Sequence, residues 1–428
     1  MLWHILRALS ALSQLGQRTA EPPITWLMRE ALVRPDLISL AAGFTDNPSL
    51  PVAETREIMD AMLRGKTGQP PLQYGTTAGD ESLRTLTASR LAKADGQPAK
   101  AKAYQPGRMM ITHGSQQLLY ILTEILFDPG DLVLVEDPSY FVYLGIMQSH
   151  GIRGRGIRME ADGIDLAHLE ATLENLKTTG DLPRLKALYL VSYHSNPAGT
   201  TTAAAKKAAA LNLLRRYESA AGHRLYLIED AAYRELRFAG DDTPSALTFD
   251  RAGSRVIYTS TYSKPYATGV RIGYGLLPGP LLAAALRVKA NHDFGTTNLL
   301  QQLITRALTS GAYDAHVQTL RSRYAKKAAA MVRACREHLP ASVKWTDPTG
   351  GLYVWAKMPA GVKTDLKSKL FAAALRQKML YVPGNLCYCP DPTRRRPNRA
   401  MRLSFGSSSI ADIREGIARL GRALQQIN

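Results

Sequence analysis

Residues Thr261–Gly273 read TYSKPYATGVRIG, and the rest of the chain is organised around this stretch. Its single lysine, Lys264, follows the hydroxyl-bearing Thr261 and Ser263, and Arg271 stands seven residues further on, next to glycines. Hydroxyl and guanidinium donors beside a glycine-containing turn can grip a phosphate, which leaves the lysine amine free for covalent chemistry. The stretch therefore predicts that Lys264 forms a Schiff base with a phosphorylated aldehyde cofactor. The alternative is an ordinary surface lysine at the end of a strand.

The segments around this stretch alternate between short apolar runs and helical patterns. Seven runs rich in Val, Ile, Leu and Tyr are predicted as strands, at residues 109–114, 132–137, 152–159, 187–193, 225–230, 256–261 and 272–278. Helical patterns separate most of them, at residues 115–127, 140–151, 203–221 and 245–252. This alternation predicts an α/β fold in which a mostly parallel seven-stranded sheet is covered by helices on both faces. Such sheets bind ligands at the C-terminal ends of their strands, where several motifs of this chain lie.

The last part of the chain has a mixed α+β pattern. Long helices are predicted over residues 281–308 and 312–337, a strand–turn–strand unit over 343–359, a strand over 401–406 and a closing helix over 410–426. A chain of 428 residues is too long for one small core. We therefore expect an N-terminal arm at residues 1–50, a large cofactor-binding domain at 51–310 and a small C-terminal α+β domain at 311–428.

The N-terminal residues MLWHILRALSALSQLGQR place apolar side chains at helical spacing, interrupted by His4 and Arg7. This pattern predicts an amphipathic arm that docks on its own protein or on a partner subunit. It lacks the uninterrupted apolar core of a secretory signal or a membrane span. The three cysteines fit a reducing compartment, so we expect a cytoplasmic protein. Cys387 and Cys389 form a C-x-C pair with no second pair nearby, and no metal is predicted.

The formal net charge is +18, which is unusual for an enzyme of ordinary composition. One interpretation is a nucleic-acid or anionic surface, and the other is an acidic substrate or a phosphorylated cofactor. The basic residues are spread along the chain, and the only run, at residues 394–399, lies among prolines and resembles a solvated loop. Nucleic-acid binding is therefore not the favoured interpretation.

Two further strand ends carry groups that such a cofactor needs. Asp230 ends the apolar run LYLIED, where its carboxylate could pair with a protonated ring nitrogen, and Tyr233 could reach a ring hydroxyl. Asn196 lies in the loop SYHSNPAGTT, where its amide could donate to a ring oxygen and to a substrate carboxylate. The structural alternatives are a helix N-cap, a half-buried tyrosine and a plain Asn-Pro turn.

Other candidates are weaker taken one at a time. Ser115 and Gln116 connect a strand to a helix, whose N-terminal N–H groups bind phosphate well. The alternative is that Ser115 only caps the helix N-terminus. Tyr140, in EDPSY, could stack on an aromatic cofactor or belong to the core. Arg402, in MRLSFG, could present a bidentate fork to a carboxylate or face water from an edge strand.

In chain order the motifs are LQYGTTAG, THGSQQ, EDPSY, NPAGTT, IEDAAY, TYSKPYATGVRIG, PTGGLYVW and MRLSFG. From about residue 22 to the C-terminus, their order and spacing resemble the fold type I pyridoxal-phosphate enzymes, and among them the class I/II aminotransferases. The chain looks most similar to the kynurenine and 2-aminoadipate aminotransferases and to the catalytic domains of MocR-type regulators. The resemblance implies pyridoxal 5′-phosphate as cofactor, a role in amino acid metabolism and a ping-pong transfer of an α-amino group from an L-amino acid to a 2-oxo acid.

The resemblance also implies residue roles. Lys264 would form the Schiff base and then move the substrate proton, while Asp230 would pair with the pyridine nitrogen. The ring would be held by Asn196, Tyr233 and Tyr140, and the phosphate by Ser115, Gln116, Thr261, Ser263 and Arg271. Tyr74 would cross to the phosphate of the neighbouring subunit, so a homodimer is implied. The substrate α-carboxylate would bind Arg402, Asn196 and the backbone at Gly43.

The sequence departs from the family pattern on the substrate side. Ser192 stands where proline is usual, His194 where the most similar subgroup often has glycine, and Ala198 where threonine is common. These departures keep open a non-transaminating reaction on the same fold, such as a cyclase, lyase, decarboxylase or oxidase. A cofactor-binding regulatory domain is a further alternative. It is disfavoured because the enzyme-like region begins near residue 22, which leaves no room ahead of it for a winged helix.

Overall fold

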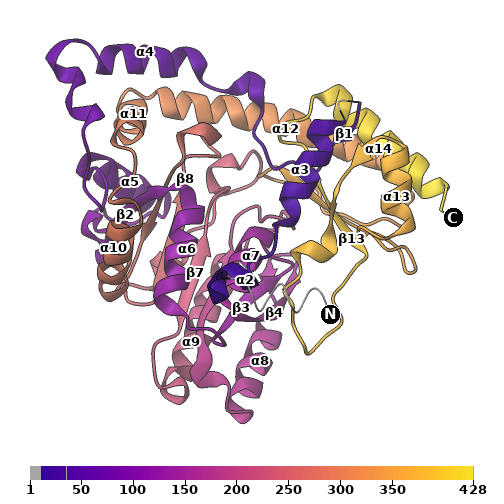
Figure 1. The fold of residues 1–428 in the computed structure, drawn as a ribbon, viewed down its shortest axis with the longest axis horizontal. Coiled ribbons are helices and arrows are strands. Elements are labelled where there is room, and N and C mark those ends of the chain that lie inside the picture. Colours follow the sequence, from indigo (N-terminus) through magenta and orange to yellow (C-terminus); the bar gives the residue numbers. More distant parts are fainter. Residues whose placement is uncertain (1–10, 35, 428) are drawn as a thin grey trace.

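The computed structural model describes residues 11–34 and 36–427, and its centre is an eight-stranded sheet (Figure 1). In spatial order the strands are β2 (Met109–His113), β9 (Ile272–Leu276), β8 (Val256–Thr261), β7 (Tyr226–Asp230), β6 (Leu185–Val191), β3 (Leu132–Asp137), β4 (Arg153–Glu160) and β5 (Gly163–Ile164). Only β9 and β5 run against the others, so the predicted mostly parallel sheet is confirmed. The prediction of seven strands missed β5, because a two-residue strand carries no hydrophobic pattern.

Helices cover both faces of this sheet, as predicted. One face packs against α6 (Gly114–Leu126), α7 (Phe141–His150) and α10 (Gly279–Asp293), and the other against α5 (Glu81–Ala94), α8 (Leu166–Thr178) and α9 (Ala204–Ala221). The alternation of strand side chains explains the two layers, because Leu188 and Leu190 of β6 join one cluster while Tyr189 and Val191 join the other. Helix α8 was not predicted, although Leu169, Leu173 and Leu176 give it a regular buried stripe.

Two predicted helices differ from the structure. The helix expected over residues 281–308 is two helices, α10 and α11 (Asn298–Thr309), because the chain turns at Phe294, whose φ is +60°. The helix expected over residues 245–252 is a single 3₁₀ turn, Ala246–Phe249. The carboxylate of Asp250 accepts hydrogen bonds from the backbone N–H groups of Arg255 and Val256, which turns the chain into β8.

A second cluster of elements forms the small α+β unit. Its sheet has the order β10 (Tyr353–Lys357), β13 (Ala400–Ser404) and β12 (Val382–Pro383), and it packs with α12 (Ala312–His338), α13 (Lys369–Arg376) and α14 (Ile410–Gln425). The antiparallel register pairs Trp355 with Arg402. The strand–turn–strand prediction over residues 343–359 is wrong in its first half, where Lys344 and Gly350 form isolated bridges, with Lys357 and Arg237, and no strand.

The chain before residue 65 wraps around both units (Figure 1). Helix α3 (Pro23–Val33) and strand β1 (Ile38–Ser39) lie beside the small unit, where β1 pairs with β11 (Met379–Leu380), and α4 (Val52–Met62) contacts α11. The predicted amphipathic arm falls partly on residues 1–10, which lie outside the described residues. The next segment, α2 (Gln14–Arg18), docks on α7, where Arg18 Nε donates to the carbonyl of Ser149 at 3.1 Å.

None of the helices in residues 11–34 and 36–427 combines the length and the apolarity that crossing a membrane requires. In the same residues, no three His, Cys, Asp or Glu side chains are grouped so that they could hold a metal ion.

Candidate active site

The sequence motifs meet at one cavity of about 210 Å³, at the edge of the sheet where the parallel strands end. Its walls come from the start of α6, the segment before α7 and the loops after β6, β7 and β8. Of the predicted cofactor-binding residues, the cavity is lined by Ser115, Gln116, Tyr140, Asn196, Asp230, Tyr233, Thr261, Ser263, Lys264 and Arg271, together with Gly114, Val191 and Ala232. Parallel strands bring their C-terminal ends together, so residues from five separate segments meet here.

One end of the cavity is built to receive an anion. Helix α6 begins at Gly114, and its first N–H groups point towards the cavity wall with the helix dipole behind them. Gly114 has a φ of +72°, and a Cβ there would lie 2.7 Å from Nη2 of Arg271. Only glycine therefore lets the guanidinium approach the start of the helix. Arg271 Nη1 also lies 3.5 Å from the Ser263 hydroxyl, so cationic and neutral donors converge.

Thr261 lines this wall and makes two hydrogen bonds within the protein. Its hydroxyl donates to the carbonyl of Ile272 at 2.9 Å and accepts from the N–H of Ser263 at 3.0 Å. The side chain thus holds the β8 loop against β9, and the Ser263 hydroxyl is the better placed donor.

Lys264 lies at the centre of the cavity wall, and its Nζ donates to the carbonyl of Gly43 at 2.9 Å. Burial lowers the pKa of Lys264 to about 8, with further lowering by the cationic charges of Arg402 and Arg271. A substantial fraction of the amine is therefore neutral near pH 8, which is the form that attacks a carbonyl carbon.

Asp230 stands at the end of β7 and is 3% exposed. Its Oδ2 accepts a hydrogen bond from the Tyr189 hydroxyl at 2.9 Å, and its Oδ1 accepts from the N–H of Ala232 at 3.1 Å. Burial raises the pKa of Asp230 to about 6, while these two donors oppose that rise. The group is mostly ionised at neutral pH, and no cation pairs with it among the described residues.

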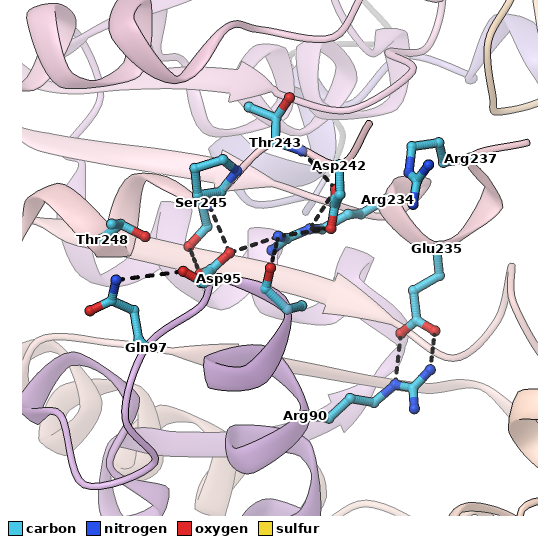
Figure 2. A network of polar contacts seen from close by, with 12 residues as sticks. Arg90, Asp95, Gln97, Arg234, Glu235, Arg237, Asp242, Thr243, Ser245 and Thr248 are labelled. Atoms are coloured by element: carbon cyan, nitrogen blue, oxygen red, sulfur yellow. Dashed lines mark hydrogen bonds and ion pairs between the residues drawn. The ribbon is translucent and has the colours of Figure 1, made fainter. Parts of the chain in front are cut away.

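Tyr233 and Tyr353 form a phenol pair beside this carboxylate. Their hydroxyl oxygens are 2.9 Å apart, and their rings meet edge to face with centroids 5.6 Å apart. Burial raises the pKa of Tyr233 well above its usual range, so it stays a neutral donor. Figure 2 shows how the next residue is anchored: the Arg234 guanidinium lies between Asp95, at 2.7 Å, and Asp242, at 3.1 Å.

Arg402 reaches the same region from β13 of the small unit and is 1% exposed. Its Nη1 donates to Oδ1 of Asn196 at 2.7 Å and its Nη2 to the carbonyl of Ala41 at 2.6 Å. The guanidinium carbon lies 4.4 Å from the Tyr353 ring centroid, and the buried Nε has no partner within the described chain. No carboxylate neutralises this buried cation in the described residues, so it suits an anionic ligand.

Tyr74 is the one predicted cofactor residue that does not reach the cavity. Its side chain is 82% exposed and meets Phe294 edge to face, with ring centroids 5.4 Å apart. The two residues line a separate hollow of about 400 Å³.

Two of the three departures from the family pattern, Ser192 and His194, are structural neighbours of the site. Ser192 is fully buried, and its backbone N–H donates to the carbonyl of Asp230 at 3.0 Å. His194 has a φ of +43°, and its ring packs so closely on Gly350 that a Cβ there would lie 2.4 Å from Nε2. Burial lowers the pKa of His194 to about 4, so the imidazole is neutral at physiological pH.

Sequence reasoning missed two residues that shape the site. Tyr189 was visible only as one apolar letter of a strand, and its contact with Asp230 depends on the register of β6 against β7. Tyr353 lies in the motif PTGGLYVW, and the pairing of its hydroxyl with that of Tyr233 joins residues 120 positions apart. An aromatic residue in a strand next to the strand that ends in aspartate is a pattern that could have indicated Tyr189.

The fold and this site define a class of protein. The family described as aminotransferase class I and II matches residues 35–420, so the chain belongs to that family. It is a fold type I, pyridoxal-phosphate-dependent enzyme that transfers amino groups.

Relatives and solved structures agree with this assignment. The chain is 31% identical over 392 residues to the aromatic-amino-acid aminotransferase 1 of Thermococcus litoralis, covering 91% of this chain and 88% of that one. The kynurenine aminotransferase of Pyrococcus horikoshii, solved in complex with PMP, superimposes with a TM-score of 0.88 at 28% identity, covering 100% and 99%. The α-aminoadipate aminotransferase of Thermus thermophilus, complexed with N-(5′-phosphopyridoxyl)-L-leucine, gives a TM-score of 0.82 at 29% identity, covering 97% and 98%.

Proposed function

We propose that the 210 Å³ cavity holds pyridoxal phosphate and that the chain transfers α-amino groups between L-amino acids and 2-oxo acids there. The observation that carries the proposal is that a lysine of lowered pKa and a buried ionised aspartate line one cavity, and that Arg402, buried without an ion pair in the described residues, binds the lining residue Asn196. The side chains of Ser263, Arg271 and Ser115, with the backbone of Gly114 and Gln116, suit the phosphate. Thr261 supports that group by shaping its loop.

The remaining cofactor contacts follow from the same geometry. Lys264 would hold the cofactor through its amine, Asp230 would face the ring nitrogen, and Asn196 and Tyr233 would face the ring oxygen. Tyr140 would stack on the ring. When bound, pyridoxal phosphate supplies an electron sink that acidifies the Cα–H of an attached amino acid.

The chain's own residues then control the proton and the substrate. The Asp230 carboxylate keeps a proton on the ring nitrogen, because an ionised partner in a buried site favours the charged ring. Lys264 Nζ takes the proton from the substrate Cα and returns it, a role for which a pKa of about 8 is well matched. Arg402 and Asn196, with the backbone near Gly43, would orient the substrate α-carboxylate, so that the Cα–H faces Lys264.

We also propose a homodimer in which Tyr74 reaches the phosphate site of the neighbouring subunit. The support is that Tyr74 and Phe294 are exposed aromatic residues that line a separate surface hollow and not the cavity that holds Lys264. Residues 51–310 would act as the cofactor-binding domain and 311–428 as the small domain, with the arm of residues 1–50 lying across both. Three free, buried cysteines support a cytoplasmic location.

The test is reconstitution of the purified apoprotein with pyridoxal phosphate, followed by an amino-acid panel. An absorbance near the visible edge should appear and should bleach when the right amino acid is added. Lys264→Ala should fold, judged by circular dichroism, but lack this band, and an unchanged band would sink the proposal.

Products should be identified by mass spectrometry with and without pyruvate or 2-oxoglutarate. Equal amounts of a new 2-oxo acid and a new amino acid mean transamination. Carbon dioxide, ammonia or a cyclised product would instead mean one of the non-transaminating reactions. A panel that includes acidic and aromatic amino acids also defines the side-chain preference.

A further inference from the structure

The hydrogen bond between Tyr189 and Asp230 lies behind the cofactor cavity, where no ligand can replace it. Tyr189 is 0% exposed and sits on β6, the strand that pairs with β7 in parallel. Its hydroxyl oxygen is 2.9 Å from Oδ2 of Asp230. Because the aspartate is ionised and acceptor-only, the hydroxyl must be the donor. A hydrogen bond to a buried carboxylate is among the stronger ones in proteins.

The other side chains around Asp230 in the described residues do not donate a hydrogen bond to its carboxylate. The titratable and charged groups that face it are Tyr189 of β6, Glu136 of β3, Tyr140 before α7, and Lys264 and Arg271 across the cavity. Glu136 is fully buried without an ion pair among the described residues, and burial raises its pKa well above the usual range, which favours its neutral form. Within the described chain, Asp230 has only Tyr189 and the N–H of Ala232 as donors.

We propose that Tyr189 is a positioning residue for the cofactor reaction, whose hydroxyl keeps Asp230 ionised and fixes the orientation of its carboxylate towards the ring nitrogen. This inference rests on the proposed role of Asp230. The Tyr189 hydroxyl occupies one lone pair of Oδ2 and the Ala232 N–H occupies one of Oδ1, so the carboxylate plane is fixed from two sides. A rotating carboxylate would otherwise have to be ordered each time the ring binds.

The chain offers a matched control in Tyr143 of α7. The Tyr143 and Tyr189 rings pack with centroids 4.2 Å apart, and both side chains are buried. The Tyr143 hydroxyl makes no hydrogen bond to Asp230 and does not line the cavity in the described structure. Tyr143→Phe therefore removes a buried hydroxyl from the same cluster without touching the carboxylate.

The experiment measures the dissociation constant of pyridoxal phosphate by titrating apo full-length chains between pH 5.5 and 8.5. Without the Tyr189 donor, the pKa of Asp230 should rise by about one unit or more, since a hydrogen bond to a charged group is lost. The dissociation constant of Tyr189→Phe, divided by that of the wild type at each pH, should rise about tenfold from pH 8.5 to pH 5.5. The cofactor's own titration cancels in this ratio, and a purely structural defect would shift it equally at every pH.

Two comparisons decide whether Tyr189 has this role. A ratio for Tyr189→Phe that is as flat with pH as that of Tyr143→Phe overturns the inference. Asp230→Asn separates this from the proposed function, because it should remove the aspartate-dependent part of the pH profile altogether. If Asp230→Asn keeps the wild-type pH profile, the proposed role of Asp230 fails as well. If Asp230→Asn changes the profile but Tyr189→Phe keeps it, the proposed role of Asp230 stands and only the role of Tyr189 fails.

Discussion

Substitution of Lys207 by methionine should sharply destabilise the part of the fold built on the eight-stranded sheet, because it leaves the buried carboxylate of Glu229 without its cationic partner. Lys207 and Glu229 are both 0% exposed, and the Lys207 Nζ lies 2.9 Å from Oε1 of Glu229. The Nζ also donates to the carbonyl of Pro244 at 3.0 Å and lies 3.9 Å from the ring centroid of Tyr193. Tyr193 belongs to the loop that carries Asn196, so this pair also supports the candidate active site.

The loss of stability can be estimated from the contacts that Glu229 keeps in Lys207→Met. In Lys207→Met, Oε2 of Glu229 keeps only the N–H of Ala246, at 2.7 Å, and Oε1 has no cation. Removing one partner of a buried ion pair costs about 3–5 kcal/mol. That is a large fraction of the roughly 5–15 kcal/mol by which proteins are stable. The double substitution Lys207→Met with Glu229→Gln should recover most of the loss, because the charge is then gone and the Ala246 contact can persist.

The preceding residue provides the control. Lys206 also makes two ion pairs, with Glu160 and with Asp162 at 2.7 Å, but these partners are 55% and 61% exposed. Lys206→Met should therefore cost no more than about 1 kcal/mol. The assay is urea unfolding of the apo chains at pH 7.5, followed by circular dichroism and compared as differences between variants. Equal losses in the two single variants would refute the reasoning, as would a double variant no more stable than Lys207→Met.

Three smaller predictions concern stability. Burial raises the pKa of Asp230 to about 6, above about 3.9 in the unfolded chain, so its contribution to apo stability is full below pH 4 and is lost as pH rises through 6. Urea unfolding should show this loss, about 3 kcal/mol, in the wild type but not in Asp230→Asn. Gly154→Ala would set a Cβ 2.0 Å from Sγ of Cys389 and should cost about 1–3 kcal/mol; an unchanged melting temperature would contradict this. Ser409→Ala removes the N-cap of α14, whose hydroxyl accepts from the N–H of Asp412 at 3.0 Å, and should cost about 1 kcal/mol by the same assay.

Most of the architecture followed from local patterns. Six of the seven longer strands were visible as almost continuously buried runs bounded by turns, whereas β4 mixes buried and exposed residues. The errors fell where the local pattern is ambiguous or short. The sequence predicts one helix over residues 281–308, whereas residues 294–297 are not helical and separate α10 from α11, with a φ of +60° at Phe294. Strand β5 is too short to carry any period.

In the candidate site, too, the residues close together in the sequence were predictable, and the contacts between those far apart were not. Ser263, Lys264 and Arg271 lie within nine residues, so a single turn after β8 brings them together, and the sequence by itself determined that group. The placement of Asp230, Asn196 and Tyr140 near strand ends was also readable, because Asp230 ends an apolar run and the other two follow one within a few residues.

Only the tertiary structure decided which distant groups meet. The bonds from Lys264 to Gly43 and from Arg402 to Asn196 join residues 221 and 206 positions apart. The contact of Tyr189 with Asp230 depends on the register of two parallel strands, and Tyr74 proved to be exposed away from the cavity. The physical reason is that strand pairing and domain packing align residues by burial and register, whereas a sequence pattern reports only what neighbouring residues do.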